Sequence, residues 1–118
     1  MRGYSGKNSK LKGIHAEVLA GKFLRQRGYR ILESNFRRKT GEIDLIAEKD
    51  GRIHFVEVRY RSRSDFGTPA ETVSRGKLAR IRNTALLYLQ YKGRNHSPAQ
   101  IDVIAITADE IHWIQNVM

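Results

Sequence analysis

The stretch that decides the fold is "GEIDLIAEKDGRIHFVEVRYR", residues 41–61. Two apolar runs, 43–47 and 53–60, have the composition of β-strands, and the "EKDG" segment between them, which ends in Asp-Gly, predicts a hairpin turn. Each run carries a carboxylate in its middle, Asp44 in the first and Glu57 in the second. A lone buried carboxylate is costly unless something pairs with it. These two acids therefore need a partner.

The patterns on both sides of this hairpin predict a single α/β domain over residues 10–118. Residues 1–9 lack periodicity and are expected to form a flexible tail, and residues 61–70 a polar loop. Gly28 can end a first helix and Ser74 can cap a second. A helix, three strands, a helix and two strands correspond to a mixed β-sheet flanked by helices. Outside the hairpin, these elements are expected at residues 10–28, 29–36, 74–92, 100–107 and 110–115.

The charge of the chain predicts a polyanionic partner. Lys and Arg number 22 against 12 Asp and Glu, so the formal net charge is +10 over 118 residues. Nucleic acid is the first candidate for such a chain. The alternatives are a merely soluble basic protein and a protein that binds an anionic membrane surface. No basic amphipathic helix with a face rich in Trp or Phe supports the membrane alternative.

Composition excludes several kinds of site. Cysteine is absent, which excludes disulfides, thiolate zinc sites and cysteine nucleophiles. The four histidines show no ligand spacing and are interpreted as structural. No apolar run approaches the roughly 20 residues of a membrane helix, and the basic N-terminus lacks the apolar segment of a secretory signal. The protein is therefore expected to be soluble and cytoplasmic, with no membrane partner.

The two strand acids point to a metal site if they share a face of the sheet. Side chains alternate along a strand, so Asp44 lies with Ile46, and Glu57 lies with Phe55 and Arg59. Two carboxylates on one face repel each other and raise one pKa unless a cation lies between them. Mg²⁺ typically takes one or two carboxylates together with phosphate oxygens of the substrate. On a basic chain, Mg²⁺ or Mn²⁺ at this position would serve the hydrolysis of a nucleic-acid backbone.

Long segments of the chain resemble a known family. "GIHAEVLAGKFLRQRGYRILESNFR", "GEIDLIA", "FVEVRYRS", "FGTPAETV" and "IDVIAI" are similar to the YraN-like family of small bacterial proteins, over nearly the whole chain. Those proteins resemble Holliday-junction resolvases of the PD-(D/E)xK nuclease superfamily. The resemblance implies a restriction-endonuclease-like fold with an α-β-β-β-α-β core and a metal site at the sheet. It implies metal ligands at Glu17, Asp44 and Glu57, and catalytic roles for these acids, for Arg59 at the superfamily's Lys position and for Lys77 in the second helix.

The residues themselves leave alternatives for two of these positions. Glu17 falls within the apolar arc of the first helix and is expected to face the core or its edge, but it could instead pair with a basic neighbour, namely Lys10, Lys12 or Arg25. Lys77 lies at the rim of the apolar stripe of the second helix. A rim Lys commonly extends to solvent, which is the alternative to a catalytic role.

The sequence departs from the superfamily pattern at two places. Arg59 keeps the charge of the usual Lys and can hold a phosphate through two hydrogen bonds, but it essentially never deprotonates. A mechanism that needs a neutral amine there is excluded. Gln100 stands where the family more often has Arg, close to Asp102. Asp102 is therefore interpreted first as structural, with a site role as the alternative. Two further acids are left open between a supporting role at the site and an ordinary structural role, namely Glu42 and Glu71.

Two functions follow from these observations. The first is a divalent-metal-dependent endonuclease that hydrolyses DNA, with branched or repair-intermediate DNA as substrate. The second is a non-catalytic DNA- or RNA-binding module on a nuclease-like fold. A basic structural protein of an RNA assembly is a third, which has no need of the acid pair. Resolvase analogy suggests a homodimer. Phosphate contacts are expected from Arg61, Arg63, Arg75, Lys77 and Arg80, with Arg82 beside them; a solvated helix face is the alternative for the helical ones.

Overall fold

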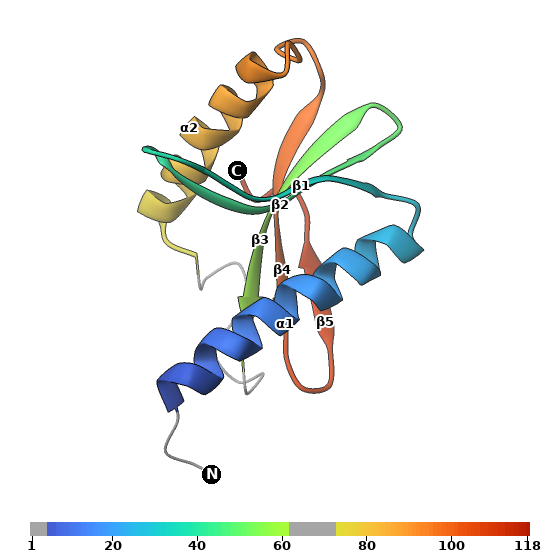
Figure 1. The fold of residues 1–118 in the computed structure, drawn as a ribbon. Coiled ribbons are helices and arrows are strands. Elements are labelled where there is room, and N and C mark those ends of the chain that lie inside the picture. Colours follow the sequence, from blue (N-terminus) through green and yellow to red (C-terminus); the bar gives the residue numbers. More distant parts are fainter. Residues whose placement is uncertain (1–4, 62–72) are drawn as a thin grey trace.

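The computed structural model describes residues 5–61 and 73–118, and the side chains of residues 15–61 and 73–118. Within these ranges the chain forms two helices and five strands in the order α-β-β-β-α-β-β (Figure 1). The bounds are α1 Ser5–Gln26, β1 Arg30–Arg38, β2 Gly41–Lys49, β3 Arg52–Tyr60, α2 Arg75–Tyr91, β4 Ala99–Ile106 and β5 Ile111–Ile114. Neither helix is long and apolar enough to cross a membrane.

The five strands form one mixed sheet in the order β1-β2-β3-β4-β5. β1, β2 and β3 are antiparallel neighbours, β3 and β4 are parallel, and β5 returns antiparallel to β4. Parallel neighbours need a crossover connection, which α2 supplies between β3 and β4. The expected single α/β domain with an α-β-β-β-α-β core is therefore confirmed.

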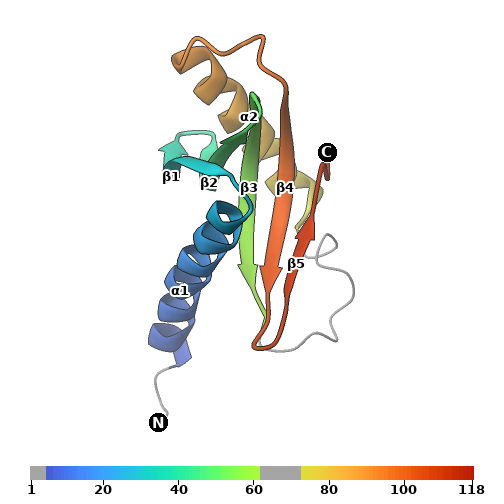
Figure 2. The same ribbon diagram turned by 90° about the vertical axis from the view of Figure 1, so that its right-hand side faces the viewer.

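The two helices pack on opposite faces of the sheet (Figure 2). Ala16, Ala20 and Leu24 of α1 form one buried cluster, which includes Val56 of β3. A second cluster joins apolar side chains of α2 to the adjacent β3 residue, Phe55. Neighbouring residues of a strand point to opposite faces, so the sheet is the central layer between two cores. The α2 side chains of the second cluster are Ile81, Ala85, Tyr88 and Leu89.

The hairpin between β2 and β3 has the predicted Asp-Gly turn. Lys49 pairs with Arg52, which leaves Asp50 and Gly51 as the two loop residues. Both have positive φ, 53° and 80° respectively. This is the pattern of a type I′ turn, whose twist matches that of the flanking strands. The turn thereby fixes the register of β2 against β3.

α1 differs from its prediction at its beginning and agrees with it at its end. It begins at Ser5, so residues 5–9 of the expected tail are helical. Extension of an existing helix requires little further free energy, and no sequence signal stops it here. At the other end, Gly28 (φ 87°) donates to the carbonyl of Arg25 and Tyr29 donates to that of Leu24, both at 3.0 Å. These two bonds make the C-terminal motif in which glycine is favoured.

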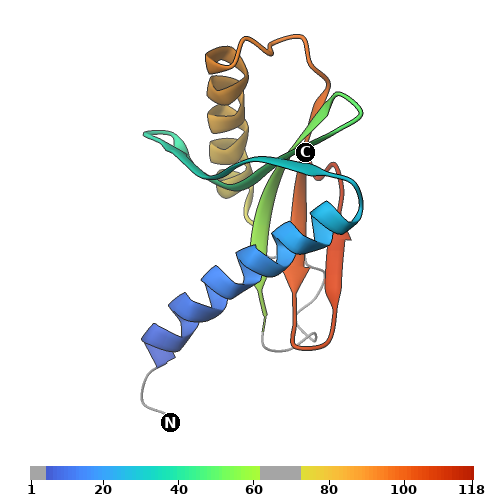
Figure 3. The ribbon, with the colours of Figure 1, turned by 45° about the vertical axis from the view of Figure 1, so that its right-hand side comes forward.

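β2 and β3 separate after a short paired segment, and the β1–β2 hairpin turns across the sheet toward α2 (Figure 3). Gly41 packs directly on α2: a Cβ there would lie 3.3 Å from both Arg80 Cβ and Thr84 Oγ1, and its φ is 151°. The hydroxyl groups of Thr40 and Thr84 are 2.7 Å apart and share a hydrogen bond. The glycine of the "GEID" motif therefore lets the hairpin lie against α2.

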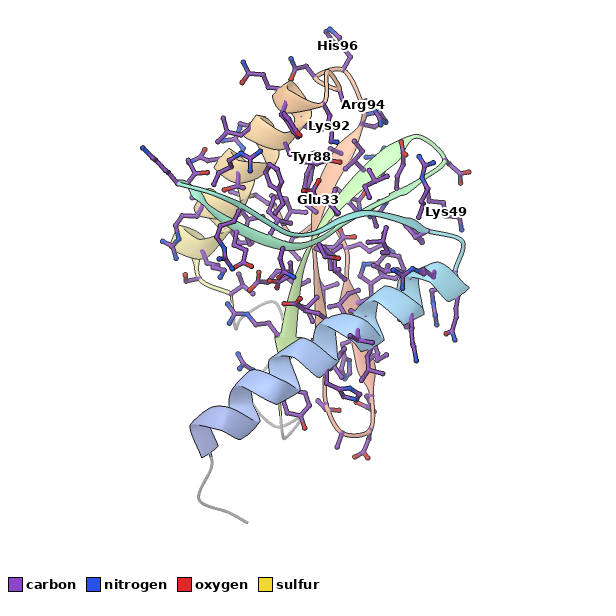
Figure 4. All side chains as sticks on the ribbon, in the orientation of Figure 1. Glu33, Lys49, Tyr88, Lys92, Arg94 and His96 are labelled. Atoms are coloured by element: carbon purple, nitrogen blue, oxygen red, sulfur yellow. The ribbon has the colours of Figure 1, made fainter. Side chains whose placement is uncertain are left out.

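The other end of the hairpin is held by Glu48. Its carboxylate accepts hydrogen bonds from Arg30 of β1 at 2.8 Å and from Arg94, which follows α2, at 2.6 Å. Both bonds lower the pKa of Glu48, and the bond from Arg94 has the larger effect. Figure 4 shows Arg94 beside Tyr88 and Lys92, at the C-terminal end of α2. The β1–β2 hairpin is thus attached to the middle of α2 and to the segment that follows its C-terminal end.

Candidate active site

Asp44 and Glu57 meet where β2 and β3 separate. The last paired residues are Leu45 and Val56, so Asp44 and Glu57 are the next opposed positions. Asp44 no longer pairs through its backbone with β3. Instead its Oδ2 accepts a hydrogen bond of 2.8 Å from the backbone N–H of Val58. The register set by the Asp-Gly turn therefore brings the two predicted acids to one place.

The environment of this pair favours neutral carboxyl groups. Glu57 is 4% exposed. Burial, followed by the negative charge of Asp44, raises the pKa of Glu57 to about 7. Burial also raises the pKa of Asp44, whereas the hydrogen bond from Val58 lowers it. A hydrogen bond between the two carboxyl groups lowers the pKa of Asp44 and raises that of Glu57, so Glu57 is the member that holds the shared proton.

Two cations lie against Glu57. Arg59 Nε is 3.2 Å and Lys77 Nζ is 3.6 Å from the same oxygen, Oε2. Arg59 reaches it along the same face of β3, two residues on. Lys77 reaches it from the first turn of α2, where its backbone N–H donates to the Ser74 cap at 3.1 Å. Both cations act to lower the pKa of Glu57, against its burial.

Glu17 lies at the edge of this group rather than within it. Burial, then the charge of Asp44, raises the pKa of Glu17. With its amide nitrogen facing the acids, Asn35 donates to Glu17 Oε1 at 3.2 Å and to Glu42 Oε2 at 3.1 Å. This orientation is assigned from the hydrogen bonds that it completes. Glu42 also pairs with Arg37 at 3.1 Å.

Asn35 is a site residue that the sequence did not indicate. Its φ of 54° lies in the left-handed region, which Asn tolerates better than most residues. The register of β1 against β2 shifts at Ile31/Glu33, a few residues before it. Asn inside a strand is a weak signal of such an irregularity, and nothing in the sequence connects it to Glu17.

The predicted metal ligands are only partly assembled. Across residues 15–61 and 73–118, no three His, Asp or Glu side chains are grouped so as to hold a metal ion. The Asp44–Glu57 pair alone fits a hard divalent cation, because Mg²⁺ needs only one or two carboxylates when water and phosphate oxygens supply its other ligands. A half-buried and a buried carboxyl group with raised pKa values, Asp44 and Glu57, are also what a cation would neutralise.

The predicted phosphate contacts that the structure describes lie on α2 and directly after β3. Arg61 follows β3, and its backbone N–H donates to the carbonyl of Ile106 at 2.8 Å. Arg75 and Arg80 are exposed on α2. The Nε atom of Arg61 is buried and makes no hydrogen bond within the described part of the chain, and that of Arg59 contacts Glu57 as an ion pair without the alignment of a hydrogen bond. Two predicted positions lie outside the described residues, namely Arg63 and Glu71.

Asp102 belongs to the core on the other side of β3. It is fully buried, and its Oδ2 accepts from His54 at 2.8 Å and from Trp113 at 3.0 Å. Its Oδ1 accepts from Gln100 and from the backbone N–H of Asn116, both at 2.9 Å. Burial alone would raise the pKa of Asp102, but these four bonds lower it. A carboxylate with this many partners has a structural role, as does His54 beside it.

Comparison with known sequences identifies the family of this chain. The model of the family described as "Uncharacterised protein family UPF0102" matches residues 16–106. The chain belongs to this family. A UPF0102 protein of Syntrophomonas wolfei is 41% identical over 98 residues, covering 83% of this chain and 85% of the relative. One of Lachnoclostridium phytofermentans is 39% identical over 110 residues, covering 92% and 93%. One of Hahella chejuensis is 48% identical over 92 residues, covering 78% and 74%.

The UPF0102 assignment confirms the expected membership of the YraN-like family. The matched range runs from α1 to the end of β4 and includes both acids of the central pair and their cations. The description of the family names no reaction. The function of this UPF0102 protein therefore has to be argued from the chemistry of its site, because one fold can carry many functions.

Proposed function

We propose that the protein is a divalent-metal-dependent endonuclease that hydrolyses phosphodiester bonds of DNA, with branched or repair-intermediate DNA as its substrate. One observation carries this proposal: the half-buried Asp44 and the buried Glu57 are opposed, with two cations against Glu57. A structural role alone does not account for the arrangement, because it leaves two carboxyl groups with raised pKa values next to each other.

Asp44 and Glu57 would hold Mg²⁺ or Mn²⁺, with Glu17 at the edge of the site. When bound, the metal would activate water and stabilise negative charge on the phosphate. Glu57 must lose its proton for this, and a pKa of about 7 makes the loss accessible at neutral pH. The hydrogen bond from Val58 holds the Asp44 carboxylate in place throughout.

Arg59 and Lys77 would bind the phosphate that is cut. Both are partly exposed, with 29% and 35% of their side-chain surfaces accessible. The guanidinium of Arg59 stays charged at every relevant pH, so it supplies electrostatic stabilisation and not a proton acceptor. Arg61, Arg75 and Arg80 would contact neighbouring phosphates, and the net charge of +10 would attract the DNA. Arg63 remains a predicted contact of the same kind.

The test is cleavage by the purified protein of branched, nicked and single-stranded DNA, with Mn²⁺ or Mg²⁺ and with a chelator instead. Asp44→Asn and Glu57→Gln keep the shapes of the side chains and remove the charges. We expect each to reduce cleavage by about a hundredfold or more, since each removes a metal ligand. The matched control is Asp109→Asn, an exposed acid in the turn between β4 and β5. Cleavage that persists in Asp44→Asn would show that the activity comes from a contaminant.

A second candidate is a non-catalytic nucleic-acid-binding module. Two points favour it: by the resemblance Arg59 stands where the superfamily has Lys, and Glu57 already has two cations against it. Calorimetry with Mn²⁺ separates the candidates. Metal binding that is lost in Glu57→Ala supports the endonuclease. DNA binding that depends strongly on salt and is indifferent to metal supports the module.

Two further parts of the proposal concern the state of the protein in the cell. A cytoplasmic location accords with the absence of cysteine, and fractionation of cells would test it. A homodimer would place two sites on two DNA strands, as the resolvase analogy suggests. Sedimentation of the free protein and of its DNA complex would measure the number of copies.

A further inference from the structure

A pocket lies between α1 and the β1–β2 hairpin, next to the candidate active site. Its volume is about 310 Å³, at the small end of the roughly 300–1,000 Å³ typical of ligand pockets. Figure 3 shows the two elements that form it, with α1 passing close to the hairpin. Glu17, which lines the pocket, is close enough to Asp44 for the charge of Asp44 to raise its pKa. The pocket therefore opens beside the proposed metal position.

The lining combines an apolar floor with a basic rim. Val18 and Gly21 of α1 and Leu45 of β2 supply apolar surface, and the Val18 side chain is 51% exposed there although it is apolar. Lys22 and Arg25 stand on the rim. Neither makes an ion pair with a residue in the described part of the chain.

Gly21 keeps the floor of this pocket open. A Cβ at Gly21 would lie 3.5 Å from Nη1 of Arg25, so the guanidinium extends back over the floor. Glycine inside a helix lowers stability relative to almost any other residue. Glycine here lets the Arg25 guanidinium lie close over the helix backbone, where it faces the pocket as a cation for a negatively charged group.

We propose that this pocket holds one unpaired nucleotide of the DNA strand next to the bond that is cut. The base and deoxyribose would lie on Val18, Gly21 and Leu45, and Lys22 and Arg25 would bind the adjoining phosphate. A pocket of this size has room for a nucleoside. A base must leave the helical stack to enter such a pocket, and this is least costly where the base is already unpaired.

This inference rests on the proposed endonuclease function and narrows its substrate. DNA that offers unpaired nucleotides beside the cleavage site, such as a gap, a flap or a branch, is preferred to intact duplex. The preference belongs to binding, so it does not require the metal or the chemical step.

Fluorescence anisotropy in EDTA tests the pocket without catalysis. The probes are a blunt duplex and the same duplex with a single-stranded gap. Gly21→Met fills the pocket and favours the helix, whereas its matched control, Gly21→Ala, adds only a Cβ in ordinary contact. We expect wild type and Gly21→Ala to bind gapped DNA about tenfold more tightly than blunt DNA, a difference equivalent to one well-placed base. Gly21→Met should lose this preference while its affinity for blunt DNA stays within about twofold.

A Gly21→Met protein that keeps the preference for gapped DNA overturns the proposal, and so does an equal loss on both probes. If Gly21→Met does not fold, the double variant Lys22→Ala/Arg25→Ala should lose the preference, whereas Arg52→Ala, an exposed cation near the β2–β3 turn, should keep it. Failure of the proposed endonuclease function can be distinguished from failure of the pocket proposal. A wild type that prefers gapped DNA but cleaves none supports the pocket and contradicts the endonuclease, whereas cleavage without any preference contradicts the pocket alone.

Discussion

The Asp44 carboxylate accepts a hydrogen bond of 2.8 Å from the backbone N–H of Val58 across two strands that have stopped pairing. The side chain takes the place of a missing backbone partner, so a buried N–H is satisfied at the point where the sheet opens. The same bond holds Asp44 beside Glu57, which precedes Val58 in β3. One contact therefore serves the integrity of the sheet and the geometry of the site.

The raised pKa of Glu57 makes the stability of the metal-free protein depend on pH. The pKa rises from an ordinary 4.5 to about 7 in the folded state, so the folded protein binds the proton more tightly than the unfolded chain. The contribution is complete below about pH 4.5 and is lost as pH rises through about 7, on the order of 3 kcal/mol in all. Asp44, whose pKa is also raised, acts in the same direction.

Urea unfolding at a series of pH values measures this effect. The free energy of unfolding of wild type should fall relative to that of Glu57→Gln between pH 4.5 and 7, because the variant has no proton to lose. Asp109→Asn should follow the wild-type curve, since Asp109 is exposed. Parallel curves for wild type and Glu57→Gln would contradict the assignment of the proton to Glu57.

A divalent metal should reverse this loss of stability. Mn²⁺ competes with the proton on Glu57, so its affinity should rise with pH across neutrality and its binding should release protons. At about a hundred times its Kd, Mn²⁺ should raise the free energy of unfolding by about 2.7 kcal/mol. Calorimetry in buffers of different ionisation enthalpy counts the protons, and thermal melts give the stabilisation. Asp44→Asn should show neither effect, and an equal stabilisation of that variant would place the metal elsewhere.

Asp102→Ala should destabilise the fold without changing the chemistry of the site. The substitution leaves His54, Gln100, Trp113 and a backbone N–H without their shared acceptor. Removal of one side of a buried charged network costs about 3–5 kcal/mol. Urea unfolding gives the loss, and DNA cleavage per folded molecule should stay at the wild-type level under conditions where the variant is folded. A selective loss of cleavage would instead give Asp102 a role at the site.

Gly41→Ala tests whether the contact of the β1–β2 hairpin with α2 positions Asp44. The new Cβ would meet Arg80 and Thr84 at 3.3 Å in a backbone conformation that suits only glycine, at a cost of about 1–3 kcal/mol. Gly93→Ala is the matched control, because Gly93 also has positive φ (66°) but no atom within 4 Å of its Cβ position. Gly41→Ala should lower both stability and cleavage, whereas Gly93→Ala should lower stability alone. Equal cleavage by the two folded variants would show that the contact does not position the site.

Local signals in the sequence were sufficient to predict the fold and the opposed pair of acids, Asp44 and Glu57, at the centre of the candidate site. The Asp50-Gly51 turn sets the register that opposes Asp44 and Glu57, and Ser74 caps the helix that carries Lys77. Strand alternation places Arg59 beside Glu57. Each of these relationships depends on residues close together in the chain or on one hairpin.

The features that the sequence did not predict depend mainly on contacts between distant segments. The bond of Asn35 to Glu17 and the four partners of Asp102 join elements that no pattern of spacing connects. The separation of β2 from β3 occurs where Gly41 packs on α2, which lies far along the chain. The early start of α1 had no distinct signal, because a helix can extend through residues of neutral propensity.

The two-residue turn between β2 and β3 makes the number of strand residues between Asp44 and Glu57 important for the site. Thirteen positions separate Asp44 from Glu57, and strand alternation means that one residue more or fewer within either strand would turn its acid to the opposite face. An insertion within β3, between Ile53 and Glu57, would leave every site residue in the sequence and still separate the two acids. A one-residue insertion there that keeps the circular dichroism of the fold should therefore lose metal binding, whereas one beside Gly51, which has open space around it, should keep it because a longer loop preserves the register.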